Sequence, residues 1–186
     1  QNYIMTPSFT RLCRGHNLTE TEAYELLEAV CKGELNECQI VAMMTFYIAR
    51  PITVHELSGY RKALLDFCIP VKLGREAIDV CGTGGDEKNT FNISTLSAIV
   101  LAASGIPVAK HGNYGSSSIS GSSDILNHFG YKFKTTSDEL NQQLDKYNIC
   151  FMHAPLFHPA LKNVAKQRKE LGTRTFFNML GPLVNP

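Results

Sequence analysis

The chain has 186 residues, of which 44% are hydrophobic and 19% are charged, proportions typical of a globular protein with a sizeable core. Its 18 basic and 17 acidic residues leave a net charge of +1, which gives no overall field for a nucleic acid or an anionic membrane. No apolar run approaches the roughly 20 residues that span a bilayer, so we expect no membrane partner, no nucleic-acid partner, and only local anion sites.

Residues 1–70 predict a small helical domain. Three capping signals each open a segment with helical apolar periodicity: Thr19 with Glu22, Asn36 with Gln39, and Thr53 with Glu56. The expected buried stripes are Ala23, Leu26, Leu27 and Val30; Ile40, Val41, Met44, Phe46 or Tyr47, and Ile48; and Leu57, Tyr60, Leu64, Leu65 and Phe67. A bundle this small exposes much of what it could bury, so we expect it to pack on another domain or on a second copy. A partner-binding groove would use the same residues.

Residues 71–186 predict the first, incomplete part of a parallel-sheet α/β domain, after a linker at 69–76. Strands are expected at 77–81, 106–109, 131–134 and 149–153. Helices are expected after an N-cap at Asn92 or Ser94, at 122–129 and 137–147, and from Pro159 to a stop at Gly172 with a core face of Leu161, Val164, Ala165 and Leu171. Such alternation predicts parallel β-α-β units, whose loops gather at the carboxyl ends of the strands.

Two loops at that edge have the composition of phosphate-binding loops. Residues 82–86 read Gly-Thr-Gly-Gly-Asp, and three glycines let several amides converge on an anion next to a helix start, which itself favours phosphate. Residues 110–113 read Lys-His-Gly-Asn and lead into a segment of glycines and serines, so a full charge joins directed donors. Two adjacent loops of this kind suit a ligand that is phosphorylated at two places.

Each of these features has a structural alternative. The glycines at 82–85 alone suit a tight turn, Asp86 could hold its own loop, and the serines at 116–118 could be ordinary loop residues. His158 before Pro159 is more often a structural cap than an acid or base, and the basic run at 162–169 is usually a solvated helix face. Lys110 after a buried strand is harder to explain structurally, because burying an unpaired ammonium is costly.

The six cysteines, at 13, 31, 38, 68, 81 and 150, contain no Cys-x-x-Cys pair. We expect buried, reduced thiols of an intracellular protein, with a zinc site or a disulfide framework as the alternative. Because no secretory pattern opens the sequence, we expect a cytoplasmic location.

The order of the motifs resembles the anthranilate phosphoribosyltransferase family. Its members show Gly-Thr-Gly-Gly-Asp, Asn-x-Ser-Thr, Lys-His-Gly-Asn and Ser-Gly-Ser, which stand here at 82, 92, 110 and 120; similarity continues through 157–160, 164–172 and 178–186. The resemblance implies a helical domain joined to an α/β domain of the nucleoside phosphorylase fold, dimer contacts through the helices, and Mg²⁺. It implies transfer of the phosphoribosyl group from phosphoribosyl pyrophosphate to the amine of anthranilate, with release of pyrophosphate.

The resemblance also implies which residues bind the substrates. Those matching the phosphoribosyl pyrophosphate site are Gly82, Gly85, Asp86, Thr90, Asn92, Ile93, Ser94, Thr95, Lys110, His111, Gly112, Asn113, Tyr114, Gly115, Ser116, Ser117, Ser118 and Ser122. Those matching the anthranilate site are Gly82, His111, Asn113, His158 and Arg168. Lys110 would act electrostatically, Arg168 would turn inward toward the substrate carboxylate, and Ser94 would contact magnesium together with pyrophosphate oxygens, since a hydroxyl alone is a poor ligand for a hard cation. No acid or base is clearly required.

The sequence departs from the family in two ways. Tyr114 stands where many members have arginine and Ile119 where many have lysine, which removes positive charge, so another cation compensates or affinity is lower. The family's α/β domain continues for roughly another hundred residues and holds an Asp-Glu pair for a second magnesium, so we expect a fragment with little turnover, whose sheet edge would be exposed.

Two rival functions remain open. A pyrimidine nucleoside phosphorylase shares the architecture, but its glycine loop usually reads Ser-Thr-Gly-Gly-Val-Gly-Asp, whereas Asp86 directly follows Gly85 here. A nucleic-acid-binding relative would need a basic stripe, which the net charge does not favour.

Overall fold

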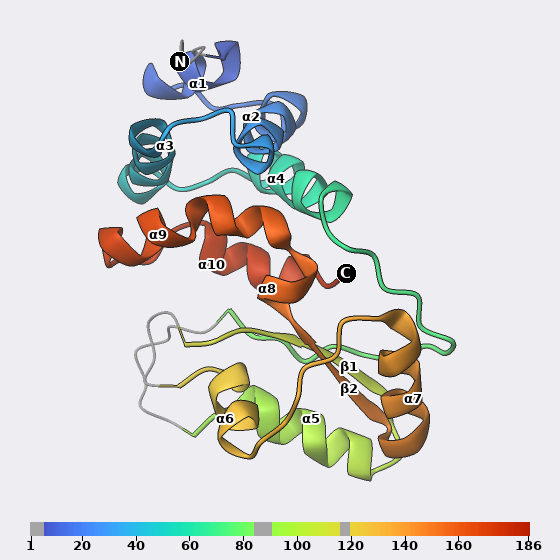
Figure 1. Cartoon of the computed structure of the whole chain (residues 1–186). Coiled ribbons are helices and arrows are strands. Elements are labelled where there is room, and N and C mark those ends of the chain that lie inside the picture. The colour runs from blue at the N-terminus through green and yellow to red at the C-terminus, as the bar shows by residue number, and fades with distance from the viewer. Residues whose placement is uncertain (1–5, 84–90, 116–119) are drawn as a thin grey trace. The chain divides into compact units, whose positions relative to one another are not determined.

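The computed structural model describes residues 6–83, 91–115 and 120–186, and it divides into two compact units (Figure 1). The helical unit comprises the chain up to Cys68 together with His158–Val184. The α/β unit comprises Ile69–Phe157 together with Asn185 and Pro186. We describe each unit by itself. The expected combination of a helical N-terminal part with parallel strands and helices is confirmed.

The helical unit is built on the three predicted capping boxes, all of which are present. The side chains of Thr19, Asn36 and Thr53 each accept a hydrogen bond from the amide three residues later. The side chain of that later residue in turn accepts a hydrogen bond from the backbone amide of the capping residue. Its elements are α1 (Pro7–Cys13), α2 (Glu20–Lys32), α3 (Glu37–Ala49), α4 (Val54–Asp66), a 3-10 turn at Pro159–Leu161, α9 (Lys162–Leu171), α10 (Phe177–Leu180) and a 3-10 turn at Gly181–Leu183. Gly172 ends α9 with a φ of 65°, as predicted.

The core of the helical unit confirms most of the predicted stripes. All four predicted residues of α2 are buried, and Val164 of α9 and Phe176 join them. Two predictions were wrong: Ile48 is 46% exposed while Met43 is buried, and Ala165 is exposed. Helix α3 is apolar on nearly every side, so periodicity could not indicate which face turns inward.

The α/β unit contains two parallel strands, β1 (Val108–Gly112) and β2 (Ile149–His153), paired in register from Val108 with Ile149 to Gly112 with His153. Its helices are α5 (Ile93–Ala103), α6 (Ser122–His128), α7 (Ser137–Tyr147) and α8 (Ala154–Phe157). The predicted helices at 122–129 and 137–147 are confirmed, and Asn92 is the N-cap of α5. Among the described residues, no helix is both long and apolar enough to cross a membrane.

Two predicted strands were wrong. The run at 77–81 makes only an isolated parallel bridge between Ile78 and Val108. Residues 131–134 are fully described and form no strand; instead the rings of Tyr131 and Phe133 pack against Phe151 of β2. Aromatic residues gave this segment its strand propensity, and their rings here cover the sheet.

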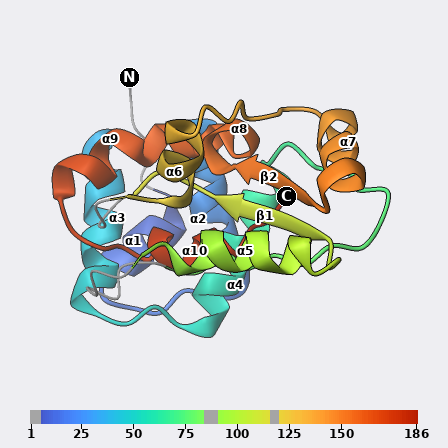
Figure 2. The ribbon, with the colours of Figure 1, turned by 90° about the horizontal axis from the view of Figure 1, so that it is seen from below.

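The two faces of the strand pair carry different helices. Ala109, Cys150 and Met152 pack with Leu140 and Leu144 of α7. Val108 and Ile149, one residue out of phase with the first set, pack instead with Ala98 and Ala102 of α5. Figures 1 and 2 show α5 and α7 on different sides of β1 and β2. Strand alternation therefore assigns Lys110 and Gly112 to the α5 face and His111 to the α7 face.

Candidate functional site

The carboxylate of Asp79 accepts several hydrogen bonds near the carboxyl end of β1. Its Oδ1 accepts hydrogen bonds from the amides of Cys81 at 3.0 Å and His111 at 3.2 Å. The bond from Cys81 forms a local turn of the kind that aspartate favours. The His111 amide would bond to a backbone carbonyl if the strand pairing continued, so its bond to Asp79 ends the pairing after Ile78. Asn185 Nδ2 donates to Asp79 Oδ2 at 2.9 Å and to Ala109 O at 3.1 Å. Three segments distant in sequence are thus joined here.

Lys110 is a buried cation at this end of the strand. It is 1% exposed, and its Nζ donates to the carbonyl of His111 at 3.3 Å. Burial lowers the pKa of Lys110, while the neighbouring Cys81 and Asp79 act in the opposite direction. A partly desolvated ammonium interacts strongly with an anion that arrives beside it, because little water screens the pair.

A single carboxylate oxygen joins the described residues on either side of 116–119 in the second loop. Asp124 Oδ2, in the first turn of α6, accepts from the amides of Gly115 at 2.8 Å and Gly121 at 2.7 Å. A side chain on Gly121 would lie 2.4 Å from the amide nitrogen of Gly115, and one on Gly112 would lie 2.3 Å from Oγ of Ser122. Gly121 therefore allows a close approach of backbone to the start of α6, whereas Gly112 leaves room for the side chains of Ser122 and Phe151.

The first loop leads to the start of α5. Asn92 Oδ1 accepts from the amide of Thr95 at 3.1 Å and from the hydroxyl of Ser94 at 3.3 Å. Thr95 is 4% exposed, and its Oγ1 makes no hydrogen bond to the described residues. Ile93 and Gly82 are exposed. The helix start thus presents free amides, two hydroxyls and the positive end of its dipole, a combination that favours an anion.

The structure describes only part of the predicted substrate site. Gly85, Asp86, Thr90, Ser116, Ser117, Ser118 and the divergent Ile119 lie outside the described residues. In the α/β unit, the carboxyl end of β1 carries Lys110, His111, Gly112 and, directly after them, Asn113 to Gly115. Tyr114 is 47% exposed, with its ring edge-on to His153 at 4.8 Å.

The two remaining anthranilate candidates belong to the helical unit. The guanidinium of Arg168 lies 5.3 Å from the ring centre of Phe177, and burial lowers its pKa. His158 Nε2 lies 2.7 Å from the carbonyl of Val184, and burial lowers the pKa of this histidine. His158 is the N-cap residue of the 3-10 turn at Pro159–Leu161, but its side chain makes no capping hydrogen bond there and contacts the remote carbonyl of Val184 instead.

Sequence reasoning missed the residues that support the loops. These are Asp79, Asp124, Asn185 and the pair Ser123 and His153, whose Oγ and Nδ1 lie 2.8 Å apart. An acidic residue at the third helical position after Gly121 was a readable signal for Asp124. No local signal could indicate Asn185, because its partners lie 76 and 106 residues away.

Comparison with known proteins gives consistent matches over both units. Residues 74–186 match the model for the glycosyl transferase family, a/b domain, and residues 7–68 match the model for the glycosyl transferase family, helical bundle domain. The anthranilate phosphoribosyltransferases of Cytophaga hutchinsonii and Christiangramia forsetii are 54% and 50% identical over 95% and 98% of this chain. The chain spans 54% and 55% of the length of these two relatives.

Solved structures show the same pattern. The anthranilate phosphoribosyltransferase of Thermus thermophilus matches 97% of this chain and 55% of its own, with a TM-score of 0.88 and 37% identity. That of Saccharomyces cerevisiae, in complex with PRPP and Mg, matches 95% of this chain and 53% of its own, with a TM-score of 0.81 and 29% identity.

Proposed function

The chain belongs to the glycosyl transferase family, and from that premise we propose that the whole protein is an anthranilate phosphoribosyltransferase of tryptophan biosynthesis. It would transfer the phosphoribosyl group from phosphoribosyl pyrophosphate to the amine of anthranilate and release pyrophosphate. The observation that carries this proposal is the arrangement at the end of β1. There a buried lysine precedes a loop in which the Asp124 carboxylate accepts hydrogen bonds from the amides of Gly115 and Gly121.

This arrangement suits the charge that the reaction develops. Breaking the bond between ribose and pyrophosphate puts positive charge on the sugar and negative charge on the leaving group, so preorganised donors stabilise the transition state. Lys110 would supply a full charge, and the α5 start with Ser94 and Thr95 would supply amides and hydroxyls. No general base is assigned, because the aromatic amine is already a neutral nucleophile.

Magnesium fits this site only together with the substrate. The Ser94 hydroxyl and Asn92 Oδ1 are neutral oxygens 3.3 Å apart, whereas Mg²⁺ prefers carboxylate or phosphate oxygens. Ser94 would therefore hold the ion jointly with pyrophosphate oxygens. When bound, the ion would neutralise charge on the leaving pyrophosphate.

Arg168 would bind the carboxylate of anthranilate. Its guanidinium lies near the ring of Phe177 and is partly desolvated, and its fork of donors matches the two oxygens of a carboxylate. His158, His111, Asn113 and Gly82 would line the same substrate.

The direct test is turnover by the full-length protein. Incubation with anthranilate, phosphoribosyl pyrophosphate and Mg²⁺ should quench the fluorescence of anthranilate, and no change at saturating substrates would refute the proposal. Lys110→Ala should weaken the binding of phosphoribosyl pyrophosphate more than that of anthranilate, and Arg168→Ala should do the reverse. Equal effects of the two substitutions would overturn the assignment of the subsites. Release of base from a pyrimidine nucleoside and phosphate would instead support the phosphorylase.

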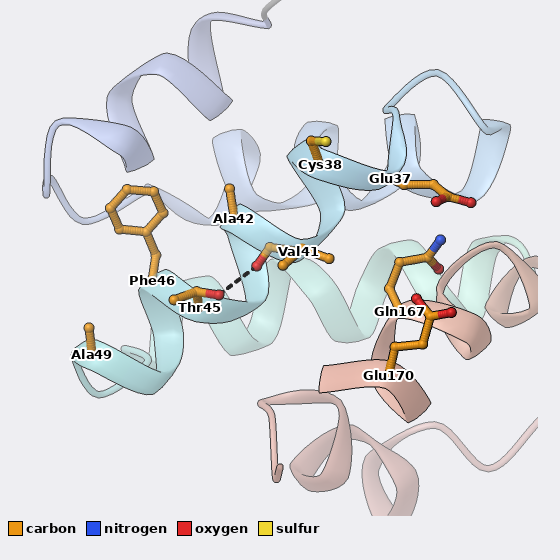
Figure 3. A pocket seen from close by; sticks show the side chains of 9 residues that line it. All are labelled: Glu37, Cys38, Val41, Ala42, Thr45, Phe46, Ala49, Gln167 and Glu170. Atoms are coloured by element: carbon orange, nitrogen blue, oxygen red, sulfur yellow. Dashed lines mark hydrogen bonds between the residues drawn. The ribbon is translucent and has the colours of Figure 1, made fainter. Parts of the chain in front are cut away.

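We also propose that the protein is a homodimer through α3. A groove of about 610 Å³ lies beside α3. Val41, Ala42, Phe46 and Ala49 of α3 line one wall, and Gln167 and Glu170 of α9 line the other (Figure 3). Helix α3 is apolar on nearly every side, which is typical of a helix covered on both sides. Ala49→Glu should shift the protein toward monomer in sedimentation, whereas Ala165→Glu, exposed on α9 outside the groove, should not. A wild-type monomer at micromolar concentration would exclude a stable dimer.

A cytoplasmic location agrees with the state of the thiols. All six cysteines are free, although only Cys150 is buried, which corrects the expectation that most of them are buried. Free thiols at exposed positions suit a reducing compartment. Fractionation of the source cells would test the location.

A further inference from the structure

Three side chains of types that bind metals lie together where residues 78–81 lie next to β1. A carboxylate oxygen of Asp79, the sulfur of Cys81 and a ring nitrogen of His111 all lie within 4.8 Å of one another, the one such group found in the described ranges. Asp79 and Cys81 are half-buried, and His111 is 2% exposed. All three residues lie well inside the sequence, away from its two ends.

The sheet geometry explains why they meet. Ile78 makes a parallel bridge with Val108, and directly after it the Asp79 carboxylate accepts hydrogen bonds from the amides of Cys81 and His111. The two hydrogen bonds to the Asp79 carboxylate therefore hold the backbone of Cys81 and His111 close to Asp79.

The surroundings are those of a supported metal site. Asn185 donates to Asp79 Oδ2 at 2.9 Å, and the amides of Cys81 and His111 donate to Oδ1, so the carboxylate is held in place. Such outer hydrogen bonds orient metal ligands. On the α7 face of the strand pair, to which strand alternation assigns His111, the apolar side chains of Ala109, Cys150 and Met152 pack together.

The donor set selects the metal. One thiolate, one imidazole and one carboxylate suit Zn²⁺, which takes four ligands in a tetrahedron and can keep a water in the fourth position. Bonds of about 2.0–2.3 Å place tetrahedral ligands about 3.3–3.8 Å apart, so the present cluster would have to contract by roughly 1 Å. Mg²⁺ prefers oxygen ligands only and would not compete for the thiolate.

We propose that Asp79, Cys81 and His111 form a site for Zn²⁺ or a similar soft divalent cation, separate from the magnesium site proposed at Ser94. Binding closes three protein–metal bonds and releases the thiol proton of Cys81 to solvent. Because His111 also belongs to the proposed substrate site, bound Zn²⁺ would compete with phosphoribosyl pyrophosphate; this consequence alone rests on the proposed function.

The test is a titration of the full-length protein with Co²⁺ as a spectroscopic substitute for Zn²⁺. The wild type should develop a thiolate-to-cobalt charge-transfer band in the near ultraviolet that saturates at one equivalent and disappears when Zn²⁺ is added. Cys81→Ser should abolish the band, and Cys38→Ser, which removes an exposed thiol of the helical unit, should leave it unchanged. His111→Ala should weaken cobalt binding at least tenfold.

A second measurement needs no variant and so is unaffected by misfolding. Zn²⁺ should slow alkylation of Cys81 in the wild type at least tenfold, as read by mass spectrometry of its peptide, while Cys38 reacts at an unchanged rate. Absence of the band, its persistence in Cys81→Ser, or equal alkylation with and without Zn²⁺ would overturn the proposal. Since no substrate is present, these outcomes are independent of transferase activity.

Discussion

Replacing Glu56 by Gln should strongly destabilise the helical unit. The Glu56 carboxylate has no exposed surface and accepts six hydrogen bonds, including 2.6 Å from Arg50 Nη2, 2.9 Å from the Leu18 amide and 3.1 Å from the Tyr47 hydroxyl. Burial disfavours its charge, but bonds from Arg50, Leu18 and Thr53 outweigh that effect and lower its pKa from 4.5 to about 2. Such a change corresponds to about 3 kcal/mol, similar to the cost of removing one partner from a buried ion pair.

The sign of the pH dependence follows from the lowered pKa. The stabilisation by Glu56 is complete above about pH 4.5 and is lost as the pH falls toward 2, because the carboxyl then takes up a proton in both states. The difference between wild type and Glu56→Gln should therefore be about 3 kcal/mol at pH 7 and shrink between pH 4.5 and pH 2.

The assay is a urea titration of the full-length protein, read from deuterium uptake in the peptides of α2 and α4. This localises the measured unfolding to the helical unit. Glu37→Gln is the matched control, since Glu37 makes an ion pair with Lys166 that is mostly exposed, and its loss should not shift the urea midpoint. A Glu56→Gln midpoint equal to that of wild type at pH 7, or a difference that does not shrink in acid, would refute the reasoning.

Three further predictions concern single contacts. Tyr60→Phe removes a buried hydroxyl 2.7 Å from that of Tyr47 and should cost about 1 kcal/mol in a urea titration; a stabilised variant would contradict the assigned bond. Gly121→Ala puts a methyl group 2.4 Å from the Gly115 amide nitrogen, so calorimetry should show at least tenfold weaker binding of phosphoribosyl pyrophosphate, and an unchanged dissociation constant would argue against this loop. Asp124→Asn weakens the acceptor shared by Gly115 and Gly121 and should also reduce that affinity, while melting of the helical unit stays unchanged.

Local signals predicted the helices well because their causes are local. The residue pairs Thr19 with Glu22 and Thr53 with Glu56 act over three residues, and the structure forms both capping boxes. The same pattern did not reveal that Glu56 also accepts from Leu18 and Arg50, although this buried interaction is the stronger one. A capping motif shows that a helix begins at a residue, but it does not show what else its side chains contact.

The strands were harder to predict because their partners are remote. The run at 77–81 contains the strand-favouring residues Ile78 and Val80, yet the side chain of Asp79 accepts the amide of His111 and the pairing ends after one bridge. The same hydrogen bond brings Asp79 and Cys81 next to His111, and residues 82 and 83, the described part of the first proposed phosphate loop, lie outside any regular element. The hydrogen bond from His111 to Asp79 thus accounts both for the wrong strand prediction and for the meeting of the three side chains of the proposed zinc site.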